Sequence, residues 1–100
     1  MARQVIWSFR AQEEKREILK YWSQRNKSTR YSKNLNQLFK DSVELIREHP
    51  HIGKLTDTPY IRIKIVKDYL LIYEVSENAI SILSIWDSRQ DPDKLSDILT

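Results

Sequence analysis

Residues 60–86 read YIRIKIVKDYLLIYEVSENAISILSIW, and this stretch decides the fold. Apolar and polar residues alternate over 60–66, which is typical of a strand with one covered face. Residues 69–75 and 79–86 are apolar at nearly every position, so both faces of these two strands are expected to be partly covered. Only a tight turn separates each strand from the next. The sequence therefore predicts a three-stranded antiparallel meander.

A strand and a helix are expected at the start of the chain. Residues 5–7 are β-branched or aromatic and predict a short first strand. Ser8 stands where a helix N-cap belongs, and the helix after it is predicted to stop within 24–27. Its inner face is expected to carry Phe9, Ala11, Lys15, Ile18, Leu19 and Trp22.

The second helix has the clearer periodicity. Ser28 is a candidate N-cap, and an amphipathic stripe then follows through Tyr31, Leu35, Leu38, Phe39, Ser42, Leu45 and Ile46. Of these, Leu38, Phe39 and Leu45 are predicted to pack this helix on the first helix and on the sheet. His49-Pro50 ends the helix, because the residue before proline is pushed out of the α region. Two helices so close in sequence are expected to form an αα-hairpin.

The remaining segments complete a single predicted domain over 1–100. Residues 49–59 form the one substantial loop and contain Gly53, the only glycine, which suggests a position with positive φ. Asp91-Pro92 is typical of the start of a short C-terminal helix. The predicted fold is α+β in the order β-α-α-β-β-β, with the helical hairpin packed on one face of an antiparallel sheet.

Composition excludes several classes of function. The chain has no cysteine, so neither a disulfide framework nor thiolate chemistry is available. Its start becomes polar too soon for a signal peptide, and no apolar run approaches the roughly 20 residues that span a bilayer. We therefore expect a cytoplasmic protein with no membrane association.

Charge is distributed unevenly along the chain. Residues 1–67 hold 15 Lys and Arg against 7 acids, a balance of +8, whereas residues 68–100 hold 2 against 7, a balance of −5. This asymmetry indicates a polyanion or an acidic protein as partner. A solvated basic surface that serves solubility is the alternative.

No motif predicts a metal or a cofactor. His49 and His51, two apart in a loop near Asp57, are not a convincing metal site without further ligands. The sequence also lacks a phosphate-binding glycine loop and a Gly-x-Ser-x-Gly elbow. We expect neither metal nor cofactor.

One strand face combines cations with aromatic residues. Tyr60, Arg62 and Lys64 share a face of the first meander strand, and cations spaced in this way can hold a phosphate. Tyr69 and Tyr73 share a face of the next strand, and Arg89 follows the last one. If these faces coincide, they form a surface of the kind that binds single-stranded nucleic acid. Alternatively, the tyrosines lie at the edge of the core and the cations are merely solvated.

Such a surface is also compatible with RNA cleavage through the substrate's own 2′-OH. Arginine and lysine would stabilise the developing charge, and a tyrosine of lowered pKa would act as acid or base. The candidate catalytic residues are Arg62, Tyr73 and Arg89. No general base stands beside them in the sequence.

The ordered set of segments resembles the RelE/ParE superfamily of bacterial toxins. The similar runs are HPHIGK (49–54), Ile61-Arg62, VKDYLLIYEV (66–75) and AISILSIWDSRQDP (79–92), and the helical half fits as well. The resemblance implies a toxin of a type II toxin–antitoxin pair, bound and neutralised by a cognate antitoxin in a hetero-oligomer.

The resemblance implies two alternative targets. RelE-like members cleave mRNA on the ribosome, and ParE-like members poison DNA gyrase. Arg62 falls on an arginine that contacts the scissile phosphate in the RNA-cleaving branch, and Lys54 and Lys64 fall near basic residues of that branch. Where that branch places a catalytic Tyr or His, this chain has Trp86-Asp87-Ser88-Arg89, which favours the gyrase poison.

The candidate target-binding residues are therefore cations and tyrosines from the second half of the chain: Lys54, Tyr60, Arg62, Lys64, Tyr69 and Arg89. A nucleic-acid-binding module without catalysis is a third alternative.

Overall fold

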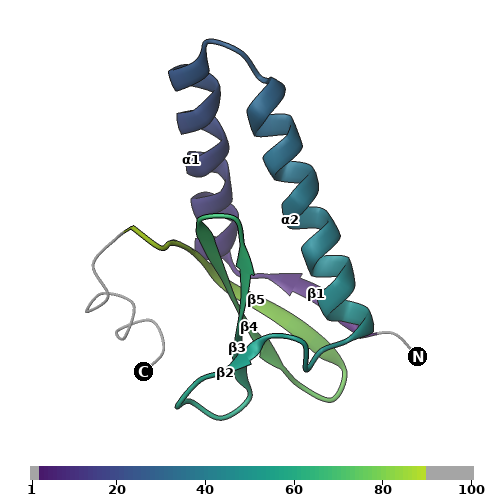
Figure 1. The fold of residues 1–100 in the computed structure, drawn as a ribbon. Coiled ribbons are helices and arrows are strands. Elements are labelled where there is room, and N and C mark those ends of the chain that lie inside the picture. The colour runs from purple at the N-terminus through teal and green to yellow at the C-terminus, as the bar shows by residue number, and fades with distance from the viewer. Residues whose placement is uncertain (1–2, 90–100) are drawn as a thin grey trace.

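The computed structural model describes residues 3–89. They form β1 (Gln4–Trp7), α1 (Phe9–Asn26), α2 (Arg30–Glu48), β2 (Lys54–Leu55), β3 (Ile61–Val66), β4 (Tyr69–Val75) and β5 (Ala79–Asp87). Figure 1 shows the two helices as a hairpin that projects away from the sheet. The α+β class is confirmed, and the expected order of elements is confirmed apart from the additional β2. The helix expected from Asp91 onward lies outside the described residues.

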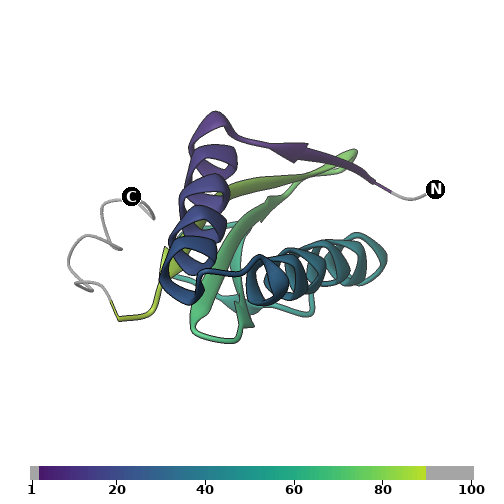
Figure 2. The same cartoon turned by 90° about the horizontal axis from the view of Figure 1, so that it is seen from above.

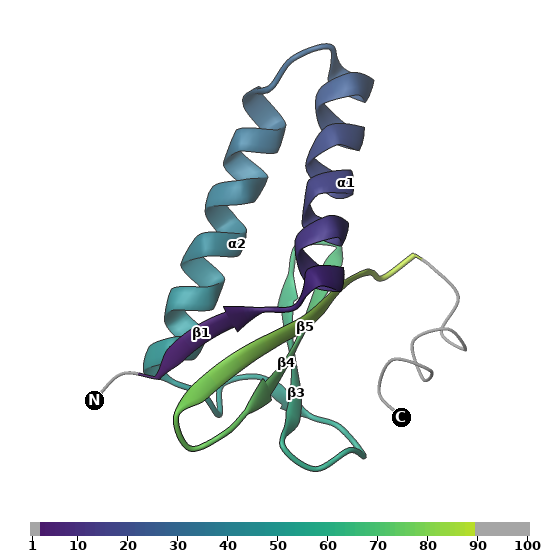
Figure 3. The ribbon, with the colours of Figure 1, turned by 180° about the vertical axis from the view of Figure 1, so that it is seen from behind.

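The strands form one mixed sheet in the order β1-β5-β4-β3-β2. β3, β4 and β5 pair antiparallel, which confirms the meander. β1 pairs in parallel with β5, with Val5 opposite Ile80, and the two strands lie side by side in Figure 3. The expectation of an antiparallel sheet is therefore wrong at this edge. The partner of β1 lies at the far end of the described chain, so no local pattern could indicate its direction.

The region before β3 differs from the sequence-based expectation at two points. Within the expected loop, Lys54 and Leu55 form β2 and pair with Ile63 and Arg62. Tyr60 does not belong to β3, because its φ of 68° interrupts the extended backbone just before Ile61. Alternation alone could not show this turn, since it reports side-chain polarity and not backbone dihedrals.

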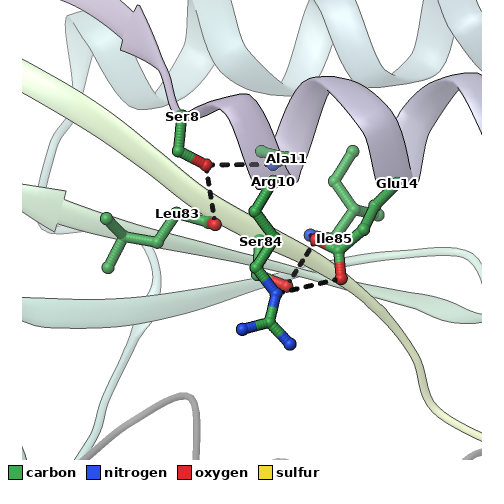
Figure 4. Close-up of polar contacts among 7 residues, drawn as sticks. All are labelled: Ser8, Arg10, Ala11, Glu14, Leu83, Ser84 and Ile85. Carbon is green, nitrogen blue, oxygen red and sulfur yellow. Dashed lines mark hydrogen bonds and ion pairs between the residues drawn. The ribbon is translucent and has the colours of Figure 1, made fainter.

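Ser8 and Glu14 attach the start of α1 to the edge of β5, as Figure 4 shows. The Ser8 hydroxyl donates to the Leu83 carbonyl at 2.9 Å. Glu14 Oε1 accepts hydrogen bonds from the Ser84 hydroxyl at 2.7 Å and from the Ile85 N–H at 3.1 Å. These contacts supply partners to β5 where β1 no longer runs beside it, so the edge is covered by a helix.

The ends of the helices lie close to where the sequence places them. The Ser8 side chain caps α1 by accepting from the Ala11 N–H, and Lys27 ends the helix in the left-handed conformation. At α2 the N-cap is Thr29 and not Ser28, and it makes no side-chain capping bond. Ser28 contributes differently, because its hydroxyl accepts from the Arg30 N–H at 3.2 Å.

The main core lies between both helices and one face of the sheet, and the view along the hairpin in Figure 2 shows the two helices diverging above the strands. Phe39 is completely buried there, as predicted, and Leu38 packs against the core. Leu45 is 38% exposed and Phe9 is 78% exposed, so both were wrongly expected inside. Val43 contacts the core instead, because the positions four and eight after Leu35, which are Phe39 and Val43, lie on the same face of α2.

The opposite face of the sheet carries a second apolar cluster. Ile61, Ile72 and Trp86 are buried there, with Ile63, Leu70 and Leu83 packed against them. No residue of α1 or α2 belongs to this cluster within residues 3–89. The near-continuous hydrophobicity of β4 and β5 is thus explained by two apolar clusters on the two faces of the sheet.

Candidate binding surfaces

Arg62, Tyr73 and Gly53 form a buried anchor for the loop that follows α2, called here the loop anchor. The Gly53 N–H donates to Tyr73 Oη at 2.9 Å, and this hydroxyl donates in turn to the Pro50 carbonyl at 2.8 Å. Arg62 Nη1 donates to the carbonyls of His51 at 3.0 Å and Gly53 at 2.8 Å. Arg62 and Tyr73 are direct partners across β3 and β4, which brings both side chains to the same loop.

The loop anchor explains why residue 53 is glycine. Its φ is not positive, so the expectation from the sequence is wrong on this point. A Cβ at residue 53 would lie 2.5 Å from Tyr73 Oη and 2.9 Å from the Ile63 carbonyl oxygen. The requirement is therefore close approach of the backbone to the sheet, which only glycine permits.

Tyr73 is held in its protonated form. Its side chain is fully buried, and burial raises its pKa above the ordinary value, although the Gly53 N–H and Arg62 act in the opposite direction. A general base needs a lowered pKa, and the hydroxyl hydrogen is already directed at a carbonyl oxygen. In this arrangement Tyr73 orders the loop.

Four exposed residues flank the loop anchor along the chain and are called here the rim: Ile52, Lys54, Leu55 and Tyr60. Leu55 is 73% exposed and Tyr60 is 74% exposed. The positive φ of Tyr60 directs the chain into β3, and its carbonyl accepts from the Val75 N–H at 2.9 Å. A non-glycine residue with positive φ costs free energy, and such residues cluster at functional sites.

Tyr69 and Arg89 lie at the other end of β4. The Tyr69 hydroxyl accepts from Trp22 Nε1 at 2.7 Å, and burial, followed by a smaller contribution from Asp87, raises its pKa. Arg89 forms a two-point ion pair with Asp87 at 3.0 and 2.8 Å, which lowers the pKa of that carboxyl group.

The sequence-predicted site residues therefore fall into two groups. Lys54, Tyr60, Arg62 and Tyr73 lie together around the loop anchor and the rim, whereas Tyr69 and Arg89 are separate. Tyr73 lies four positions after Tyr69 in β4, or about 13 Å away at roughly 3.3 Å per residue. Lys64 lies between the groups, opposite Leu71.

The tyrosines do share a face with Arg62 and Lys64, but it is the face that the helices cover. Tyr69 is 3% exposed and Tyr73 is fully buried, so neither ring is available to stack on a base. The cations reach the margin of this face because β3 lies near the edge of the sheet.

A groove between β1 and the two helices, called here the β1–α2 groove, was not identified from the sequence. It has a volume of about 450 Å³, and its lining combines apolar side chains with two lysines and two acids: Val5, Trp7, Lys15, Gln37, Lys40, Asp41, Val43 and Glu44. Lys15 Nζ lies 4.6 Å from the centroid of the Trp7 ring, and burial, followed by the nearby charge of Lys40, lowers the pKa of Lys15. The signal in the sequence was a lysine within the inner stripe of the first helix.

A second groove of about 490 Å³ lies between α1 and the end of β5 and is acidic. Its charged lining consists of Glu13, Glu14, Glu17, Asp87 and Arg89. Arg89 is paired with Asp87, so the groove as a whole does not attract anions.

Within residues 3–89, no helix combines the length and the hydrophobicity that spanning a membrane requires. No group of three or more metal-ligating side chains in the same range could hold a metal ion.

Comparison with known proteins gives one family and one fold. Residues 5–92 match the family model described as "ParE toxin of type II toxin-antitoxin system, parDE". A chain from a solved structure, "Chromosomal ParDE TA system from P. aeruginosa", is similar with a TM-score of 0.73 over 86% of this chain and 96% of that chain. Their sequences are 14% identical, so this likeness concerns the fold alone. No curated protein sequence matches.

Proposed function

This chain belongs to the ParE toxin family of type II toxin–antitoxin systems, and from this premise we propose that it stops growth by poisoning DNA gyrase until a cognate antitoxin binds it. The proposal places the protein in the cytoplasm, where gyrase acts. Inhibition then depends on contact between two proteins and needs no catalytic group of the toxin.

The environment of the candidate catalytic residues carries this proposal. Tyr73 is buried with a raised pKa, and Arg62 binds two loop carbonyls. Arg89 is paired with Asp87 at the other end of β4. A catalytic constellation must converge on one reacting atom, and these three side chains do not.

The rim supplies the surface for a protein target. Leu55 and Tyr60 are large, exposed apolar side chains beside the cation of Lys54. Interfaces concentrate their binding energy in a few such residues, and tyrosine is enriched among them. The loop anchor below holds the rim in place, which reduces the conformational entropy lost on binding.

The β1–α2 groove is the candidate contact for the antitoxin. Lys15 and Lys40 lie there above an apolar floor that includes Val5 and Trp7, and Asp41 and Glu44 line the same groove. An antitoxin segment rich in Asp, Glu and Leu would cover the floor with its leucines and pair its acids with the two lysines, folding as it binds. We expect this segment to extend over part of the helical hairpin and the open face of the sheet, giving a hetero-oligomer.

An RNA-cleaving, RelE-like activity on the ribosome is the second candidate. Arg62 supports it, because the hydrogen bonds of its guanidinium to His51 and Gly53 both use Nη1 and the side chain is only half-buried. Its remaining donors could contact a phosphate. Removing such a contact would lower the rate by on the order of 10²–10³.

One induction experiment separates the two candidates. The chain is expressed in bacteria, mRNA 5′ ends on ribosomes are mapped, and gyrase-linked DNA breaks are measured in the same cells. We expect DNA breaks and intact messages. Codon-phased mRNA cuts that disappear with Arg62→Ala, without DNA breaks, would overturn the gyrase proposal. Arg16→Ala is the control, since Arg16 is an exposed arginine of α1 that lies outside the candidate site.

A further inference from the structure

The end of the helical hairpin carries a cluster of exposed cations that the proposed function does not use. We call it the hairpin tip and define it by Lys20, Arg25, Lys27, Arg30 and Lys33, all exposed. The sequence contains no Asp or Glu anywhere in 18–40. Within residues 3–89, none of these cations forms an ion pair. The hairpin tip is therefore a concentrated positive charge without internal neutralisation.

Two of these cations occupy an unfavourable position. Arg30 and Lys33 lie in the first turn of α2, where the helix dipole is positive and acidic residues are preferred; this turn has none. Thr29 makes no side-chain capping bond, and within residues 3–89 the only side-chain acceptor at this turn that involves these residues is Ser28 Oγ, 3.2 Å from the Arg30 N–H. Local choices that oppose stability are expected where a site binds a ligand, and here the ligand must be an anion.

A further cation adjoins the hairpin tip from the sheet. Lys67, in the turn between β3 and β4, places its Nζ 5.4 Å from the centroid of the Tyr31 ring. Its backbone has a positive φ of 55°. The Lys67 ammonium therefore lies beside the start of α2, although the neighbouring Asp68 balances its charge within the turn.

The surroundings of the hairpin tip favour a double helix as the ligand. Single strands are bound by aromatic platforms, but Trp22 packs against Tyr21 at 5.1 Å and against Tyr31 at 4.9 Å between ring centroids. An acidic amphipathic peptide needs apolar contacts, and between residues 20 and 33 the structure exposes only Tyr21 among the large apolar side chains. Figure 1 shows a projecting end, and a projection can approach a duplex backbone from outside.

We propose that the hairpin tip binds the phosphate backbone of a nucleic-acid duplex. The cations would contact phosphates without reading bases, so affinity would be independent of sequence and strongly dependent on salt. This inference goes beyond gyrase binding, because it assigns to the toxin its own affinity for a duplex. Duplex binding by the hairpin tip can be confirmed or refuted independently of which protein the toxin inhibits.

The test measures binding of the purified full-length chain to labelled duplexes by fluorescence anisotropy at several salt concentrations. The variant Arg25→Gln/Arg30→Gln/Lys33→Gln removes three tip charges. The control, Arg10→Gln/Arg16→Gln/Arg47→Gln, removes the same charge from arginines at the opposite ends of the two helices, each paired with a carboxylate. Thermal melting verifies that both variants are folded.

We expect the tip variant to lose roughly tenfold or more in affinity and its log–log salt slope to become shallower by about 2.7, at about 0.9 per lost phosphate contact. The control should lose much less. A DNA duplex and an RNA duplex of equal length distinguish the two sources of backbone. Three results would overturn the proposal. The two variants could lose the same affinity for the duplex, the tip variant could bind the duplex as tightly as the wild type, or the wild type could bind single strands or polyglutamate more tightly than the duplex.

Discussion

Arg62 in the loop anchor and Arg30 at the hairpin tip are the same residue type in opposite surroundings. Arg62 donates to two backbone carbonyls and shares its loop with the buried hydroxyl of Tyr73. Arg30 is exposed, lies at the positive end of a helix and has no ion-pair partner within residues 3–89. The comparison shows that the same basic residue type orders a loop in one place and is left without an internal partner in the other, so residue type alone does not indicate a binding role.

The largest expected effect in this comparison comes from Gly53→Ala. The new methyl group would press on Tyr73 Oη and on the Ile63 carbonyl, so we expect a loss of about 2–4 kcal/mol of unfolding free energy from overpacking and a weakened hydrogen bond. Urea denaturation measures it. Combined with Tyr73→Phe, the losses should be less than additive, because the atom at 2.5 Å is gone. Full additivity would show that the two residues are not coupled.

Tyr73→Phe should cost about 1–3 kcal/mol, because the Gly53 N–H and the Pro50 carbonyl lose their partner. The matched control is Tyr60→Phe, which removes a hydroxyl from an exposed ring and should change the melting temperature very little. If both variants melted alike, the loop anchor would not stabilise the fold.

Alkaline pH should reduce the stability that the Tyr73 hydroxyl contributes through the loop anchor. The pKa of Tyr73 is raised by burial, so its contribution is complete below the ordinary tyrosine pKa of about 10 and is lost as pH rises through the higher folded value. Each proton released on unfolding lowers stability by up to about 1.4 kcal/mol per pH unit in that range. Tyr73→Phe should therefore have a shallower alkaline slope in pH-dependent denaturation. An identical alkaline slope in the wild type and in Tyr73→Phe would contradict a raised pKa of Tyr73 in the folded protein.

The smallest effect on stability is expected at the hairpin tip. Arg30→Gln and Lys33→Gln should change the unfolding free energy by no more than about 0.5 kcal/mol, with a gain favoured because a cation leaves the positive end of α2. Differential scanning calorimetry at low salt measures the change. A loss above about 1 kcal/mol, twice what surface substitutions usually cost, would show that these cations are structural.

The fold was largely predictable because its elements carry strong local patterns. The stripe around Phe39 and the short turns of the meander specified the helical hairpin and the three central strands. The parallel pairing of β1 was not predictable, since it joins segments from opposite ends of the described chain. The exposure of Leu45 was missed because periodicity gives a face of the helix but not its rotation on the sheet.

The candidate site was less predictable, because the same residue type serves both structure and binding. Alternation placed Arg62 and Lys64 on one face correctly, but it could not show that helices cover that face over Tyr69 and Tyr73. The close approach at Gly53 depends on a contact with a residue twenty positions away. The β1–α2 groove was not predicted, although Lys15 stands within an apolar stripe, where a partly buried cation was the available signal.

The rim gives the most direct test of gyrase poisoning by surface contact. Purified gyrase, plasmid DNA and the toxin are incubated, and cleaved DNA is quantified for the wild type and for Leu55→Ser/Tyr60→Ser. Ile6→Ser/Phe9→Ser is the matched control, since Ile6 and Phe9 are 47% and 78% exposed elsewhere on the surface. We expect the rim variant to lose at least roughly tenfold in cleavage, as removal of interface hot spots does, with an unchanged melting temperature and an active control. Two results would contradict gyrase poisoning through the rim: full DNA cleavage with the rim variant, or no gyrase-dependent DNA cleavage with the wild type.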